Sequence, residues 1–231
     1  MSSIKSMFKK QFLDTLKNRM ILIQFIMMPL MAFILTELVG KGNDDLPDSM
    51  FVTMFAAMFV GMSPLTTTAG AIAEDRERKS LRFLVMAGVK QHEYLFGIGG
   101  FVLVICSIIS VFFGLIGGFK GLELLKFILI LIFGCATTIV LGATIGIFSK
   151  NQQTATAISV PVFMVFSFAP MVSQFNESVA KFANVLYTQQ INVVVNDITM
   201  SASKPYLIIL ANLVVFIALF AFAFKSKGLK G

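Results

Sequence analysis

Charged residues are scarce in this sequence. Only 13% of its 231 residues are charged and 57% are hydrophobic, whereas a soluble domain typically carries about 25% charged residues. So little polar surface cannot coat a soluble globule of this size. The apolar residues come in runs of roughly 18 or more, which fits a hydrocarbon layer about 30 Å thick. We therefore expect an all-α integral membrane protein.

Cysteine and histidine are almost missing. Cys106 and Cys135 both fall inside apolar runs, and neither their spacing nor their flanks indicate a metal site or a disulfide. The only histidine, His92, follows a charged stretch. Intramembrane catalysis needs a nucleophile with a Lys or His base, or several metal ligands, inside the spans. We expect no catalytic residue and no metal site in this chain.

A phosphate-binding loop of the form GxxxxGK[ST] is also absent. Gly40 and Lys41 are adjacent, but Leu35 stands where the first glycine belongs and Gly42 where Ser or Thr belongs. This chain should therefore not hydrolyse ATP alone.

What the sequence does contain is a set of apolar spans that can each cross a bilayer at a helical rise of about 1.5 Å per residue. We expect six of them, at 21–39, 51–72, 95–118, 124–148, 155–174 and 206–224. The semi-polar stretch 176–205 between the last two predicts short helices lying at, or dipping into, the outer interface. Two GxxxG spacings, Gly114 with Gly118 and Gly142 with Gly146, indicate close helix approach within one subunit rather than a dimer contact.

Basic residues set the expected orientation. The segments 1–20, 73–94, 149–154 and 225–231 hold 14 of the 19 Lys and Arg residues, and basic residues accumulate on the cytoplasmic side. We expect both termini in the cytoplasm, a multi-pass protein of the cell membrane, and a single transmembrane domain over 1–231. The net charge of +7 is then a topology signal and not a sign of nucleic-acid binding.

The N-terminal 20 residues predict an amphipathic helix in the headgroup plane. Ile4, Phe8, Phe12 and Leu16 follow at helical spacing with lysines between them. A solvated basic tail is the alternative.

The stretch 73–94 is the most informative loop. Orientation needs only positive charge, yet here four acids interleave with five bases. We expect a helix with internal salt bridges, such as Asp75 with Lys79, and with Arg78 and Arg82 left free for a partner. An apolar edge of Leu81, Leu84 and Val85 suits a docking helix. A solvated connector is the alternative.

This loop resembles that of the type 2 ATP-binding-cassette exporter permeases. The resemblance lies in EDRE at 74–77, in Ser80, Leu81 and Leu84, in YLFG at 94–97 and in SKNQQTATA at 149–157. Six spans and an amphipathic N-terminal helix extend it over nearly the whole chain. Ser80 stands where Thr is commoner in that family, and Gly88 and Val89 where a proline often sits.

The resemblance implies a permease subunit whose loop docks as a coupling helix on a separate ATPase. That ATPase would bind ATP and Mg, so this chain would hold no cofactor, and a second permease, identical or not, would complete the transporter. The ATPase-coupling residues would be Glu74, Asp75, Arg76, Glu77, Arg78, Lys79, Ser80, Leu81, Leu84 and Val85.

Short outer loops and a sparsely charged interior favour a hydrophobic or amphipathic cargo: a peptide toxin or antimicrobial peptide first, a drug or lipid next. The candidate path residues are Glu37, Thr67 and Asn212, although the run 66–68 would equally hydrogen-bond its own helix. Sodium export through Glu37, an ATP-independent channel or secondary transporter, and a membrane scaffold or immunity protein are the alternatives.

Overall fold

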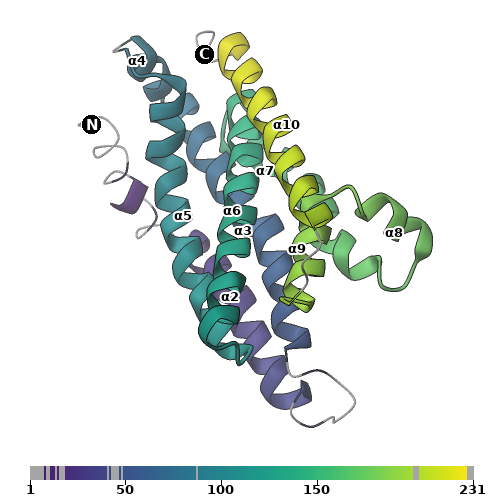
Figure 1. The fold of residues 1–231 in the computed structure, drawn as a ribbon. Helices are drawn as coiled ribbons and strands as arrows, with labels where there is room; N and C mark the ends of the chain where they lie inside the picture. The colour runs from purple at the N-terminus through teal and green to yellow at the C-terminus, as the bar shows by residue number, and fades with distance from the viewer. Residues whose placement is uncertain are drawn as a thin grey trace.

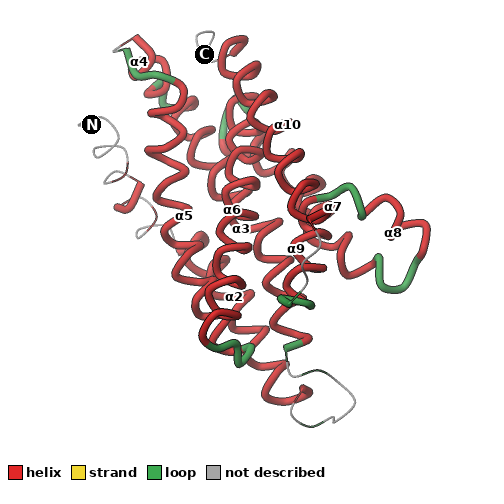
Figure 2. Tube along the Cα trace, viewed as in Figure 1, coloured by secondary structure: helices red, strands yellow, loops and turns green. Residues whose placement is uncertain are grey.

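The computed structural model describes residues 8, 11–13, 15, 19–40, 42, 47, 49–86, 88–199 and 203–227, and no strand occurs among them (Figures 1 and 2). Six of the helices in this described part of the chain are long and apolar enough to cross a membrane, which confirms the predicted fold class. They are α2 (Arg19–Leu35) with its π-helical continuation η1 (Thr36–Gly40), α3 (Met50–Glu77), α5 (Gln91–Ile116), α6 (Gly121–Phe148), α7 (Gln152–Val172) and α10 (Ser203–Lys227). Three shorter helices are α4 (Ser80–Met86), α8 (Glu177–Ala183) and α9 (Tyr187–Asn196).

Helix α3 is the centre of the bundle. It packs against α2, α5, α6, α7 and α9 and is the most buried of the six long helices. Small residues let α6 approach it closely: a Cβ on Gly142 would lie 2.5 Å from the Leu65 carbonyl oxygen, and one on Gly146 2.8 Å from that of Ala69. The second GxxxG spacing therefore serves packing within the subunit, as predicted.

The stretch 176–205 does contain short helices. Helix α9 packs against α3, α6, α7 and α10, whereas α8 projects from the side of the bundle (Figure 1). The buried Tyr187 hydroxyl lies 2.7 Å from Thr138 Oγ1, which itself donates to the Val60 carbonyl oxygen at 2.7 Å. This chain of hydrogen bonds fixes the start of α9 to α6 and α3.

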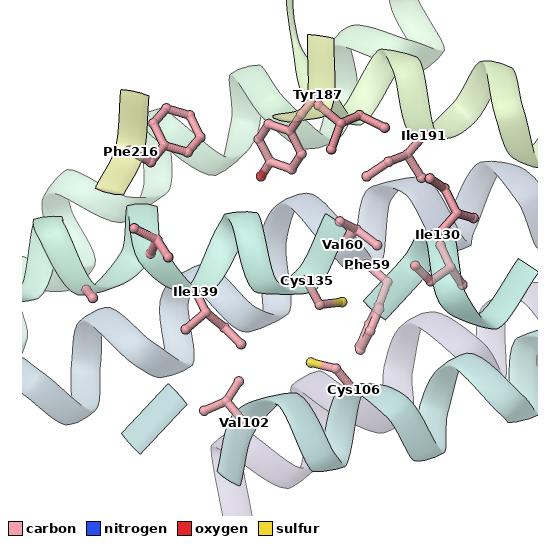
Figure 3. Close-up of a cluster of buried hydrophobic side chains, with 14 of the residues drawn as sticks. Phe59, Val60, Val102, Cys106, Ile130, Cys135, Ile139, Tyr187, Ile191 and Phe216 are labelled. Carbon is pink, nitrogen blue, oxygen red and sulfur yellow. The ribbon is translucent and has the colours of Figure 1, made fainter. Parts of the chain in front are cut away.

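Figure 3 shows the apolar core that surrounds this contact. Cys106 on α5 and Cys135 on α6 point toward each other there, and both are free and buried. They act as small hydrophobic residues in the core, in line with the prediction from their apolar flanks.

The long helices extend past the apolar spans predicted for them, and α3 and α5 do so furthest at one end. Helix α3 continues through the charged stretch to Glu77, and α5 already begins at Gln91. The α5 extension is capped, because the Lys90 backbone N–H donates to Glu93 Oε2 at 3.0 Å. Hydropathy marks where a helix leaves hydrocarbon, whereas capping and side-chain pairs decide where it ends.

The contact between α3 and α6 generates a prediction. In Gly142→Ala the new methyl group meets Leu65 backbone, so we expect a loss of about 1–3 kcal/mol in the free energy of unfolding. Gly100→Ala is the control, since nothing lies within 4 Å of a Cβ there and alanine favours a helix. Thermal unfolding in detergent micelles measures both. Equal midpoints for the two variants would contradict the close approach.

Candidate functional site: the charged end of α3

Helix α3 is too long to end inside a bilayer. Its 28 residues span about 42 Å at 1.5 Å per residue, against about 30 Å of hydrocarbon. The excess lies at its C-terminal end, where all its charged residues, 74–77, are found. We call this region, together with α4 and the loop 149–151, the charged end of the bundle. It lies at the same end as the end of α10 (Figure 1).

Asp75 ties three helices together at the charged end. Asp75 is 4% exposed, and its carboxyl group accepts hydrogen bonds from Ser80 Oγ, at the start of α4, and from the Tyr94 hydroxyl on α5, both at 3.0 Å. Tyr94 is itself buried. A buried carboxyl group needs such partners, because desolvation without them is costly. The position of α4 is therefore fixed relative to α3 and α5.

Arg76 joins α3 to the end of α6. Its Nη1 donates to the carbonyl oxygen of Ser149 at 3.1 Å and to that of Ile147. The last carbonyl groups of a helix have no partner within the helix and carry partial negative charge, so a guanidinium group there is favourable.

Glu74 and Glu77 bind the start of α7. The Gln152 amide Nε2 donates to Glu74 Oε2 at 2.8 Å, and the Gln152 backbone N–H donates to Glu77 Oε2 at 3.2 Å. Carboxylates near a helix N-terminus are favourable because the helix dipole is positive there. Arg76, Glu74 and Glu77 thus attach α3 to both sides of the loop 149–151. We call this set of contacts, with those of Asp75, the α3 clamp.

The structure corrects two expectations for this loop. Arg78 is not free, because its Nη2 lies 2.6 Å from Glu74 Oε1. The stretch is also not one helix: α3 ends at Glu77, Lys79 adopts a left-handed φ of 60°, and α4 begins at Ser80. Asp75 and Lys79 therefore do not lie one turn apart on a single helix. The prediction that they pair through that helical spacing is wrong. The side chains of Arg82 and Val85 lie outside the described part of the chain.

Helix α4 has one anchored and one exposed face. Leu81 is buried and Leu84 packs against the core, whereas Phe83 and Met86 are each 66% exposed. Helix α4 therefore presents apolar side chains beside the charged residues of the turn that precedes it.

The N-terminal segment contacts the bundle through two of its four predicted apolar residues. The rings of Phe8 and Phe12 pack edge-on against Phe101 of α5, with centroids 5.4 and 5.9 Å away. Ile4 and Leu16 lie outside the described residues.

The three predicted path residues lie in different surroundings. Glu37 is in the π-helical end of α2, and Asn212 Nδ2 donates to the Val185 and Ile208 carbonyl oxygens. Thr67 lines a cavity of about 320 Å³ beside the α3 clamp, and Glu74 and Gln152 line it too. Of the three, only Thr67 lies there, and the roles of all three stay predictions. Within the described residues no group of three or more His, Cys, Asp or Glu is placed to hold a metal ion.

The sequence did not predict that the acids of 74–77 form hydrogen bonds within this chain. Tyr94 and the stretch 149–157 were singled out only as parts of motifs, and neither was expected to contact these acids. The available signal was the Tyr94 hydroxyl, which needs a partner when the ring is buried.

The Asp75 contacts generate a second prediction. Tyr94→Phe removes one donor from a buried carboxyl group, so we expect the free energy of unfolding to fall by about 1.5–3 kcal/mol. Tyr206→Phe is the matched control, because Tyr206 is 42% exposed. Thermal unfolding of both variants in nanodiscs gives the comparison. The proposed importance of this bond fails if Tyr94→Phe is as stable as the unchanged chain.

The comparisons with known proteins identify the family of this chain. The family model described as ABC-2 family transporter protein matches residues 3–225, nearly the whole chain, and confirms the resemblance drawn from the sequence. No curated protein matches the chain. Members of this family are membrane components of transporters and are not themselves catalytic. This chain belongs to the ABC-2 family of transporter proteins.

Proposed function

We propose that this chain is the permease subunit of an ATP-driven exporter, powered by a separate ATPase that binds ATP and Mg and docks on α4. The observation that carries the proposal is the division of α4 into an anchored and an exposed face. Phe83 and Met86, three residues apart on one face, offer an apolar contact, and the exposed Lys79 adds charge beside it. Such a surface fits a groove on a partner protein.

The α3 clamp supports the transmission of force. A partner that moves α4 also moves α3, because Ser80 and Tyr94 hold Asp75. Through Arg76 and Glu77 the same motion reaches α6 and α7. The coupling residues predicted from the sequence therefore divide into two groups. Glu74, Asp75, Arg76 and Glu77 connect helices within the chain, and the turn at 78–79 with α4 faces the partner.

The cargo we propose is hydrophobic or amphipathic, with a peptide toxin or antimicrobial peptide favoured over a drug or a lipid. The long helices expose many large apolar side chains and few charges. A second permease subunit, both termini in the cytoplasm and outward transport complete the proposal.

The test is docking of the partner ATPase, for which an ATP-binding-cassette ATPase encoded next to this gene would be the candidate. Phe83→Asp should abolish co-purification of that ATPase and its stimulation by the permease, because a charge replaces the apolar contact. Leu122→Asp is the control: Leu122 is also 66% exposed but is the second residue of α6, at the opposite end of the bundle. Both variants should still insert in the membrane.

Unchanged co-purification of Phe83→Asp would contradict docking on α4. Accessibility of residues 74–93 from outside the cell would also contradict it, since no nucleotide-driven partner could then reach them.

A further inference from the structure

A mostly apolar pocket lies between α6, α9 and α10, which pack against one another. Its volume is about 290 Å³, close to the lower limit of about 300 Å³ for ligand-binding sites. The apolar part of its lining comes from α6, from α9 and from the turn after α9: Leu129, Ile130, Phe133, Val194 and Ile198. The pocket shares no lining residue with the cavity beside the α3 clamp.

The pocket has a buried floor and an open rim. Ile130, Val194 and Ile198 are each less than 9% exposed, whereas Leu129 is 56% exposed. Helices α6 and α10 are both long and apolar enough to cross the membrane, so acyl chains surround this surface in a bilayer. An empty groove would lose dispersion contacts on its lining. An acyl chain that enters it is therefore favourable.

Two polar residues, Lys126 and Tyr206, complete the lining. Helices α6 and α10 measure about 42 and 38 Å at 1.5 Å per residue, so each extends about 4–6 Å past a hydrocarbon layer of about 30 Å at either end. Lys126 lies about 8 Å from the start of α6, and Tyr206 about 5 Å from the start of α10. Both starts are at the end of the bundle opposite to the charged end. The two side chains thus reach the level of the lipid headgroups, where Lys and Tyr are favourable.

The ammonium group of Lys126 is available to a ligand. Lys126 is exposed and has no ion pair or hydrogen bond with any described residue. Glu123, three residues earlier on α6, neither pairs with it nor lines the pocket. An ammonium group has only donors, and a phenol hydroxyl can donate as well, so Lys126 and Tyr206 suit the oxygens of a phosphate group.

We propose that this pocket binds an anionic phospholipid of the leaflet at this end of the bundle. Its phosphate contacts Lys126 and Tyr206, and one acyl chain lies on the apolar floor. The order along α6 fits such a ligand, because Leu129, Ile130 and Phe133 follow Lys126 toward the middle of the span. With both termini in the cytoplasm, this is the outer leaflet. The inference goes beyond the proposed function and does not depend on the ATPase.

A single tryptophan can test the proposal, because the chain contains none. Leu129→Trp places the indole at the rim of the pocket. Leu207→Trp is the matched control, since Leu207 is 61% exposed and follows Tyr206 but does not line the pocket. The full chain is reconstituted in bilayers that contain brominated phosphatidylglycerol or brominated phosphatidylcholine, and quenching gives the relative binding constant of the two lipids. The preference for phosphatidylglycerol should be about fivefold greater at Leu129→Trp than at Leu207→Trp.

Three further measurements in the Leu129→Trp background identify the ligand. Lys126→Gln should lower the preference by about fivefold, and Lys126→Arg should keep it. Lys204→Gln is the control, because Lys204 lies at the same end of α10, is exposed and does not line the pocket. Its preference should equal that of the unchanged lysine. Glycerol phosphate in the buffer, which has the phosphate but no acyl chain, should leave the quenching unchanged.

Equal preferences at the two tryptophans would overturn the inference, and this comparison needs no change at Lys126. So would an unchanged preference in Lys126→Gln, or an equal loss in Lys204→Gln. Relief of quenching by glycerol phosphate would show a site for free phosphate instead of a lipid. Absence of quenching by both brominated lipids at Leu129→Trp would show that protein, not lipid, covers the pocket.

Discussion

A buried carboxyl group at the end of the central helix fixes the geometry on which the rest of this structure depends. Asp75 lies where α3 leaves the apolar part of the bundle, and it keeps its hydrogen bonds only while Ser80 and Tyr94 stay in place. Any displacement of α4 or α5 from α3 would leave a desolvated carboxyl group with fewer partners. This constraint makes α4 a rigid extension of α3 instead of a loose connector.

The same end of α3 is attached to α6 and α7, and the attachment works together with close packing deeper in the bundle. Gly142 and Gly146 let α6 lie against α3, so the two helices share a continuous contact that leads to Arg76 and the Ser149 carbonyl oxygen. Packed interiors transmit displacement because they hold few voids. A force applied to α4 would therefore reach α3, α5, α6 and α7, and through α3 and α7 the walls of the cavity beside Glu74.

The sequence predicted the helical class, the six spans and the contact of Gly142 and Gly146 with α3, because hydropathy and glycine spacing depend on local residue type alone. The other GxxxG spacing was wrong for Gly118, which lies in a turn after the end of α5 with a φ of 72°. The sequence also singled out residues 74–85 as the candidate ATPase-coupling residues, a role that stays a prediction. It did not predict how their charges are used, because the partners of Arg76 and Glu77 lie more than 70 residues away at Ser149 and Gln152. The break at Lys79 was missed for a similar reason: a left-handed residue that is not glycine is held by tertiary contacts, not by propensity.

If the account is right, the charged end moves as one body when the ATPase closes. The most direct measurement is the distance between spin labels at Lys90, where α5 begins, and Gln153, in the first turn of α7, in the transporter with and without ATP. Both residues are exposed and outside the proposed docking surface. The account predicts that this distance within one subunit stays the same while the distance between the Lys90 labels of two permease subunits changes. A nucleotide-dependent change within the subunit would contradict the α3 clamp.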